Sequence, residues 1–327
     1  MTASTLRKAA SIGLFLVCLM LPVIVLAALG QPGSAGIWTL GTLETLIMLL
    51  GVSARLTLPT IAAFGVATTL AVLSAGSPLW SLCVMGGVAG ACGLSARYGW
   101  WGSASALPIA LAFVTTNPPH PLSNAATVPN ALTAGIVMAL AAAWAALFAS
   151  KLRGRIHFPS ADPASQRRTI AFAVLVAVLI GAAAWVVARY DLGHGGAWMM
   201  MTILLVLQPY GARTLQRSLH RALGTILGFA IAFAIGFVIH PPWALFVLGL
   251  ACMGVALSLL SGTNPYWKIV TWITPAVVLL EGYSGSVIET DRIRLTYTLV
   301  GAAVALAALV VLAGADKLRR RITAPTH

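Results

Sequence analysis

A chain of 327 residues that is 59% hydrophobic and only 8% charged cannot be an ordinary soluble domain, in which about a quarter of the residues are charged. Its formal net charge of +13 suggests a nucleic-acid partner, but the basic residues lie in short segments between apolar blocks, which argues against a phosphate-binding surface. Since these blocks have about the length that crosses a bilayer and lipid satisfies no backbone group, we expect an all-α, polytopic membrane protein.

Twelve candidate membrane spans follow one another along the chain. They cover residues 10–29, 36–52, 57–75, 79–96, 100–117, 128–149, 169–188, 197–210, 218–239, 242–260, 264–281 and 292–313. The first span follows Arg7 and Lys8 and resembles a signal peptide, but its apolar run is longer than a usual signal sequence. We therefore expect it to be a retained helix.

The basic residues orient these spans in the bilayer. With twelve spans, 17 of the 20 lysines and arginines fall on one side, which the positive-inside rule makes cytoplasmic. Arg189, Arg292 and Arg294 fall on the other side, together with four of the seven acidic residues. The sequence therefore predicts an inner-membrane protein with both termini in the cytoplasm.

The two halves of the chain resemble each other. Gly36-Ile37-Trp38 matches Gly196-Ala197-Trp198 at an offset of 160 residues, and the mid-span prolines Pro108 and Pro275 match at an offset of 167. Each of these prolines should kink or break its helix. Six spans in each half predict two parallel repeats. We expect the first repeat at residues 1–150, a basic cytoplasmic linker at 151–168, and the second repeat at 169–327.

The sequence lacks the motifs of an enzyme or a metal protein. It contains no HExxH, GxSxG or GxxxxGK[ST] pattern, and only one carboxylate, Glu44, lies squarely inside a span, away from its ends. The four cysteines, Cys18, Cys83, Cys92 and Cys252, are interpreted as small buried hydrophobic residues. We expect no catalytic residue, no metal site and no cofactor, which leaves a transporter, a channel or a membrane scaffold.

The densest polar segment follows the eighth span. Pro209 and Gly211 should end a helix there. Arg213, Arg217 and Arg221 then recur every four residues along one helix face. Such a basic stripe would attract anions to the mouth of a bundle. Alternatively, the three side chains extend to the lipid headgroups as positive-inside anchors.

A longer pattern surrounds this segment and carries a family resemblance. It comprises Trp198, Pro209-x-Gly211, Arg221-x-x-Gly224-Thr225-x-x-Gly228, Tyr266, Thr271, Thr274 and Arg294-x-x-x-Thr298-x-x-Gly301. Residues of about 170–313 thereby resemble the fusaric acid resistance (FUSC-like) family, which includes aromatic acid exporters and is related to aluminium-activated malate transporters. The counterpart in the first half, Ile61 to Thr68, lacks the Arg-x-x-Gly-Thr core.

The resemblance implies proton-driven export of organic anions, typically aromatic carboxylates. Arg221, Gly224, Thr225, Gly228 and Arg294 inherit the family pattern, and Thr271 joins them as a substrate-pathway candidate. Arg221 and Arg294 would supply positive charge from opposite ends of a pathway between the repeats. The alternatives are an anion channel of related architecture and a non-transporting envelope or scaffold protein. Small organic anions and the lipid bilayer are the expected partners, and a homo-oligomer or a periplasmic adaptor stays open.

Three further interpretations concern single residues or pairs. Glu44 could take up and release protons during transport, or it could be a protonated glutamate bonded to a neighbouring helix. Lys268 could meet a substrate carboxylate, or it could lie at the headgroups beside interfacial aromatic residues. The GxxxG pairs Gly86/Gly90 and Gly224/Gly228 predict close helix packing.

Overall fold

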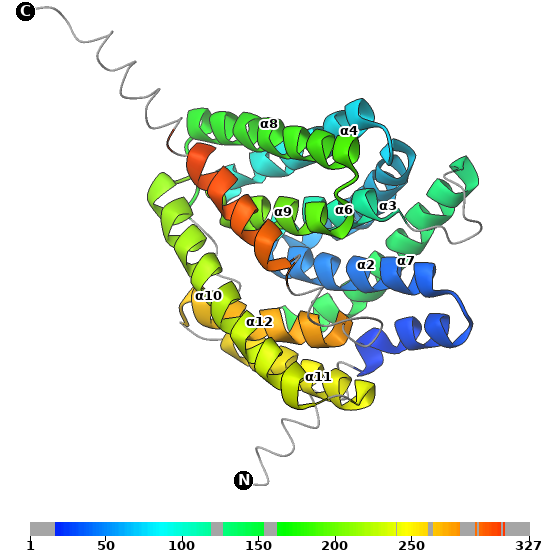
Figure 1. The fold of residues 1–327 in the computed structure, drawn as a ribbon. Helices are drawn as coiled ribbons and strands as arrows, with labels where there is room; N and C mark the ends of the chain where they lie inside the picture. The colour runs from blue at the N-terminus through cyan, green and yellow to red at the C-terminus, as the bar shows by residue number, and fades with distance from the viewer. Residues whose placement is uncertain are drawn as a thin grey trace, which may run out of the picture. The chain divides into compact units, whose positions relative to one another are not determined.

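The computed structural model describes residues 17–118, 127–153, 162–239, 241–260, 264–281, 292, 294–308 and 310. Within these residues every regular element is a helix (Figure 1). The chain divides into two compact units, Met1–His194 and Gly195–His327. The predicted all-α class is therefore confirmed for the described part of the chain.

Unit 1 begins with the helix Val17–Ala28. It continues with α2 (Pro32–Gly51), η1 (Ala54–Leu56), α3 (Thr57–Ser74), α4 (Pro78–Gly93), η2 (Leu94–Tyr98), α5 (Trp101–Ala104), α6 (Ala106–Thr116), α7 (Val128–Leu152) and α8 (Gln166–Tyr190). Helices α2, α4 and α7 each carry a proline in their first turn. Proline is well tolerated there because the first N–H groups of a helix have no intrahelical partner.

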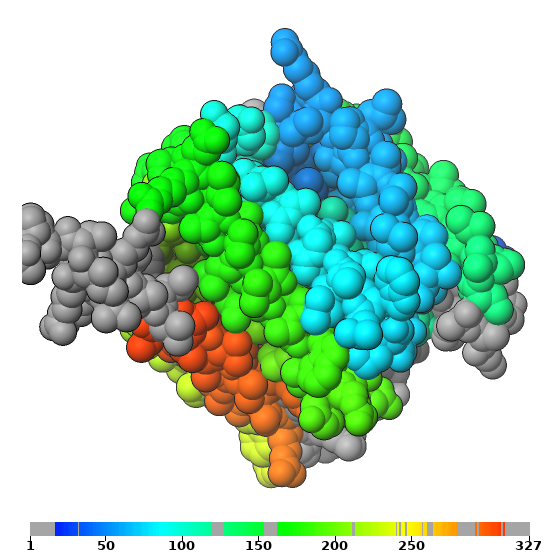
Figure 2. All heavy atoms as spheres, turned by 90° about the horizontal axis from the view of Figure 1, so that it is seen from above, coloured from blue at the N-terminus to red at the C-terminus, as the bar shows by residue number. Residues whose placement is uncertain are grey.

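Helices α4 and α8 pack against each other through small residues. Figure 2 shows the cyan surface of α4 lying against the green surface of α8. A Cβ atom at Gly86 would lie 2.8 Å from the carbonyl oxygen of Ala177, and one at Gly90 would lie 2.9 Å from the Cβ of Ala177. Only glycine permits this approach, so the predicted packing role of Gly86 and Gly90 is confirmed.

A proline interrupts the fifth predicted span. The helix ends at Ala104 and resumes at Ala106, and Pro108 is the third residue of α6. The proline ring clashes with the carbonyl group four residues earlier, which here belongs to Ala104. Pro275, the matching proline, lies inside α12 (Tyr266–Glu281), which continues through it. The predicted distortion is thus found as a helix break only at Pro108.

Arg153 fastens the C-terminal end of α2 to the end of α7. Its Nε and Nη2 groups donate to the carbonyl oxygen of Leu49, at 3.1 and 3.0 Å, and Nη2 also donates to the hydroxyl of Thr57 at 3.3 Å. The last carbonyl groups of a helix lack intrahelical partners, and a cation is favourable near them. Arg153 is therefore a helix cap as well as part of the predicted cytoplasmic charge.

Unit 2 is built on α12. It contains most of α9 (Gly193–Val206), then α10 (Gly211–Val238), α11 (Pro242–Leu260), α12 and the helix Arg294–Ala308. Helix α12 packs against both α10 and α11. A Cβ atom at Gly224 would lie 2.6 Å from the carbonyl oxygen of Trp267, and one at Gly228 would lie 2.8 Å from that of Thr271. The second GxxxG pair therefore also serves close packing, as predicted.

The described helices have the lengths and surfaces of membrane spans. Six are long and apolar enough to cross a bilayer: Gly33–Gly51, Ala54–Ser74, Pro78–Tyr98, Val128–Leu152, Gln166–Tyr190 and Arg213–Val238. Shorter apolar helices lie at the other predicted spans. Large hydrophobic side chains such as Leu58 and Phe237 are three-quarters exposed, as lipid-facing residues are. The chain is a multi-pass membrane protein, while its twelve spans, inner-membrane location and orientation stay predictions.

The division into repeats also stays a prediction. The linker at residues 151–168 lies largely outside the described residues. Helix α8, which follows it, groups by its packing with α4 in unit 1. The boundary between the two compact units along the chain therefore falls between His194 and Gly195, after the first helix of the predicted second repeat.

Candidate functional site

The helix ends between α9 and α10, where the sequence predicted that it would. Helix α9 ends at Val206 and α10 begins at Gly211, with Pro209 between them. The Thr214 hydroxyl accepts a hydrogen bond from the backbone N–H of Gln208 at 3.0 Å and lies 3.2 Å from its carbonyl oxygen. These bonds fix the first turn of α10 and hence the direction of its basic residues.

The basic stripe on α10 separates into two environments. Arg213 lies over the ring of Tyr210 at 5.2 Å and Arg217 lies over the ring of Tyr266 at 5.4 Å, and both are half-buried. Arg221 is only 6% exposed. Successive positions four apart turn by about 40° on a helix, so Arg221 points about 80° away from Arg213. The anchor interpretation fits Arg213 and Arg217, and Arg221 lies inside unit 2.

Arg221 and Thr225 present buried polar atoms without partners among the described residues. Neither Nε of Arg221 nor Oγ1 of Thr225 has a hydrogen-bond partner there, and Thr225 is 4% exposed. No described carboxylate forms an ion pair with Arg221. A buried, unpaired cation is unfavourable unless a ligand or water neutralises or solvates it.

Arg294 reaches the same region from the last helix among the described residues, Arg294–Ala308. Its guanidinium carbon lies 3.8 Å from the ring centroid of Trp198 on α9, within the range of a cation–π interaction. The two helices approach closely about two turns after Arg294, where a Cβ atom at Gly301 would lie 2.7 Å from the carbonyl oxygen of Met199. Trp198 and Gly301 thereby hold Arg294 in place.

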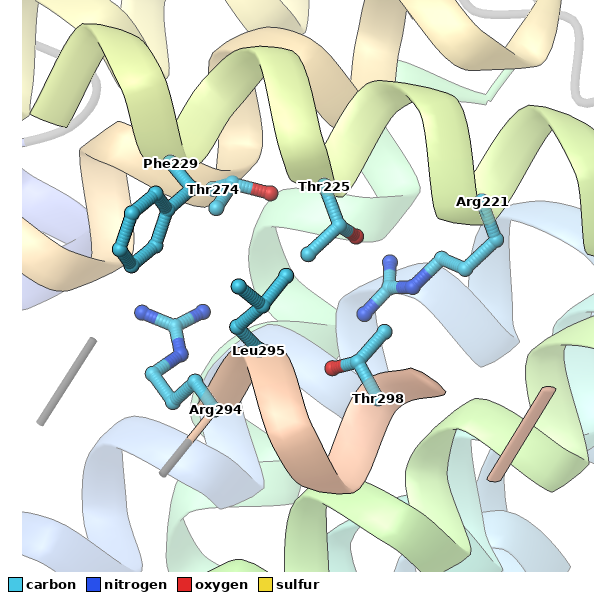
Figure 3. A pocket seen from close by; sticks show the side chains of 7 residues that line it. All are labelled: Arg221, Thr225, Phe229, Thr274, Arg294, Leu295 and Thr298. Carbon is cyan, nitrogen blue, oxygen red and sulfur yellow. The ribbon is translucent and has the colours of Figure 1, made fainter. Parts of the chain in front are cut away.

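Arg221 and Arg294 line one cavity in unit 2. Figure 3 shows the two guanidinium groups approaching it from opposite sides, from α10 and from the last helix. Its lining residues are Arg221, Thr225, Phe229, Thr274, Arg294, Leu295 and Thr298. The cavity volume is about 10 Å³, which is room for one water-sized occupant. The sequence had suggested charge supplied from opposite ends of a long pathway, whereas the structure brings both arginines to one small cavity.

The other predicted pathway residues of unit 2 lie outside this lining. Lys268 is exposed, with its Nζ atom 5.8 Å from the ring of Trp267, which matches an interfacial anchor. The buried hydroxyl of Thr271 donates to the carbonyl oxygen of Trp267 at 2.9 Å. Gly224 and Gly228 position the cavity by bringing α10 against α12.

Glu44 lies in unit 1, within α2, and is half-buried. Its carboxylate forms no hydrogen bond or ion pair with any residue the structure describes, so a bonded neighbour is not found in that part of the chain. It is not among the residues that line the cavity of unit 2. A role in proton coupling stays a prediction.

No group of three histidine, cysteine, aspartate or glutamate residues within the described ranges could hold a metal ion. All four cysteines have free thiols. Cys252 is buried, whereas Cys83 is exposed on α4, so the interpretation of all four as buried residues is wrong for Cys83. An exposed thiol on an apolar helix faces the region that lipid occupies.

Four lining residues were not predicted as site residues. Thr274 and Thr298 belong to the family-like pattern, but nothing in their spacing indicated a cavity. Phe229 follows Thr225 by four residues, so the helical period alone places it on the same face of α10. Leu295 adjoins Arg294 in sequence, and its place between the two arginines depends on the packing of unit 2 (Figure 3).

One comparison with known proteins bears on this site. Residues 182–308 match the family model of fusaric acid resistance protein-like proteins. The match covers less than half of the chain and contains every residue that lines the cavity. The resemblance inferred from the sequence is therefore confirmed for these residues. No curated protein and no solved structure matches the chain.

Proposed function

From the fusaric acid resistance-like character of residues 182–308, we propose that this membrane protein exports small organic anions, such as aromatic carboxylates. The cavity of unit 2 would bind their carboxylate group. One observation carries this proposal: Arg221 faces the cavity from a membrane helix, is almost fully buried, and has no described acidic partner. Ionisable residues inside membrane segments are costly and usually serve a substrate or ion pathway.

Arg221 lies near the cytoplasmic end of the predicted span of residues 218–239. It is ten residues, or about 15 Å along the axis, after Gly211, the first residue of α10, but only three residues after the start of that span. Burial within the protein, and not depth in the bilayer, is therefore what separates it from the headgroups. Burial against α12 and the last helix further separates this guanidinium from lipid.

The lining of the cavity suits a carboxylate joined to an apolar body. A guanidinium group binds a carboxylate through two parallel hydrogen bonds, and the Thr225 and Thr298 hydroxyls add further donors. Phe229 and Leu295 supply apolar contacts for a ring. Arg294 adds a second cation, while the Trp198 ring beneath it limits its freedom to move.

The cavity must open before it can hold an aromatic acid, since its present volume of about 10 Å³ admits one water-sized occupant. Transporters alternate between states in which a central site is closed and open. We take the described conformation as a closed state.

Transport by purified protein in liposomes tests this function. We would measure movement of radiolabelled benzoate and 4-hydroxybenzoate, with neutral benzamide as the uncharged comparison, for the wild type, Arg221→Gln and Arg217→Gln. Removing a charge-assisted hydrogen bond should lower the apparent affinity by about tenfold or more in Arg221→Gln. Arg217→Gln, altered four residues earlier on the same helix, should stay within about twofold of the wild type.

Three results would oppose the proposal. Equal losses in Arg217→Gln and Arg221→Gln would mean that general charge, and not the cavity, attracts the anion. Absence of protein-dependent flux for every acid would leave the scaffold alternative. Steady single-channel currents in planar bilayers, without coupling to a proton gradient, would instead favour the anion channel.

A further inference from the structure

The closed cavity raises the question of what it contains between transport events. It is lined by two guanidinium groups, and no carboxylate is among the described residues that line it. Thr225 and Arg221 each present a buried atom with no hydrogen-bond partner in the described part of the chain. Both side chains are more than nine-tenths buried, so bulk water reaches them poorly.

The unpartnered atoms also indicate the kind of occupant. Nε of Arg221 can only donate a hydrogen bond, and the Thr225 hydroxyl can donate one as well. Buried donors are ordinarily satisfied, and the described residues provide no acceptor for these two atoms. The surrounding positive charge favours an acceptor that carries negative charge over a neutral water molecule. A metal cation is disfavoured by the same charge.

The size of the cavity limits the choice further. A volume of about 10 Å³ suits an occupant about as large as one water molecule. A chloride ion is only moderately larger than a water molecule, whereas sulfate, phosphate and an aromatic acid each have several times its volume. Phe229 and Leu295 close the space with apolar groups, which offer no further hydrogen bonds to a polyatomic oxyanion (Figure 3).

We propose that the closed cavity binds one small monatomic inorganic anion of the chloride class, held by Arg221 and Thr225. This anion neutralises the buried guanidinium when no organic substrate is present. The carboxylate of the organic anion then displaces it as the cavity opens, so that one anion exchanges for another at the same cations. The site itself requires only the observed lining, whereas the displacement step rests on the proposed function.

The site is testable by chloride-35 nuclear magnetic resonance on the purified full-length protein. Protein exchanged into chloride-free sodium methanesulfonate buffer would receive sodium chloride, and the extra linewidth of the chloride signal would report chloride that binds and exchanges. Arg221→Gln and the nearly isosteric Thr225→Val remove one donor each. Thr271→Val is the matched control, because that buried hydroxyl bonds within α12 and does not line the cavity.

We expect extra linewidth in the wild type and in Thr271→Val. Binding should be weaker by about tenfold or more in Arg221→Gln and by a few-fold in Thr225→Val. Chloride should also raise the melting temperature of the wild type above its value in methanesulfonate. If Arg221→Gln fails to fold, Thr225→Val and this melting shift still decide the matter.

Three outcomes bear on the two parts of the proposal. No extra linewidth and no melting shift in the wild type would overturn the anion site, because water alone would then fill the cavity. Broadening that is the same in wild type, Arg221→Gln and Thr225→Val would also overturn it. Broadening that depends on both residues but persists in saturating benzoate would support the site and overturn displacement. The liposome flux of benzoate is a separate measurement, so failure of export and failure of this site are distinguishable.

Discussion

The guanidinium group of Arg294 lies 3.8 Å from the centre of the Trp198 ring, and this stack links the last helix to α9 within unit 2. The other cation–aromatic pairs described on α10 and α12 are wider, between 5.2 and 5.8 Å, and their cations are more exposed. A buried cation over an aromatic face gains more than an exposed one, because water competes less. The pair is therefore expected to fix the direction in which Arg294 faces the cavity.

Replacement of Trp198 should consequently weaken substrate binding without removing any cation. Trp198→Leu removes the aromatic face that holds the Arg294 guanidinium. We expect the free energy of benzoate binding to weaken by about 1–2 kcal/mol, which corresponds to a rise in apparent Km of about five- to thirtyfold. Trp198→Phe keeps an aromatic face and should fall between this variant and the wild type. Benzoate flux in liposomes measures the effect.

The control for this prediction is Trp267→Leu, which removes a ring beneath the exposed Lys268. It should change the Km little. Equal behaviour of Trp198→Leu and Trp267→Leu would show that the Arg294 stack has no special part in binding.

Gly228 provides a second test, of packing. A Cβ atom there would lie 2.6 Å from Cβ of Thr274 and 2.8 Å from the carbonyl oxygen of Thr271. That carbonyl is the one that Pro275 leaves without its helix N–H, since the proline is four residues later. Because both neighbours belong to one helix, Gly228→Ala must push α10 and α12 apart.

We expect Gly228→Ala to destabilise the protein by about 1–3 kcal/mol, the usual range for overpacking. Gly254→Ala, on α11, is the matched control because nothing lies within 4 Å of its added Cβ. That variant should be neutral or slightly more stable. Thermal unfolding in detergent compares the two, and equal melting temperatures would contradict the close α10–α12 contact.

Arg153 yields a prediction about stability alone. Its two hydrogen bonds to the Leu49 carbonyl oxygen join the ends of α2 and α7 in unit 1. Arg153→Gln removes the cation and should cost about 1–3 kcal/mol, while benzoate affinity stays near that of the wild type. Lys151→Gln removes a neighbouring exposed cation and should leave the melting temperature unchanged. A large loss of affinity in Arg153→Gln would instead connect unit 1 to substrate binding.

Local features of this fold were predictable because each depends on a few adjacent residues. The end of α9 and the start of α10 follow from Pro209 and Gly211. The GxxxG pairs allowed close packing to be predicted, although not the partner helices. Pro108 predicted a distortion, and the chain breaks there, but α12 absorbs Pro275 without a break. Whether a helix continues past a proline depends on its neighbours, which the sequence does not reveal.

The site was predictable only in part. Arg221 and Arg294 were identified as important, yet the sequence alone does not reveal that both reach one cavity. Arg217 and Arg221 have the same spacing and chemistry, and only tertiary packing makes one half-exposed and the other buried. Phe229 and Leu295 resemble any lipid-facing residue in sequence, because apolar side chains in a membrane helix carry no signal of which face is inside.

Glu44 is the predicted proton-coupling group of the proposed transport cycle. It is the one carboxylate placed squarely inside a predicted span, and the described residues offer its side chain no hydrogen-bond or ion-pair partner. In a proton-coupled exporter, a proton gradient directed opposite to the movement of benzoate should accelerate that movement several-fold in the wild type. Glu44→Gln cannot exchange a proton and should lose this acceleration, while flux without a gradient continues because the Arg221 cavity is intact. Glu44→Asp keeps a titratable group and should retain a gradient response. If Glu44→Gln shows full activity with an unchanged response to the gradient, this glutamate is not the coupling group. If the flux through the wild type does not respond to the gradient either, the result favours the anion-channel alternative.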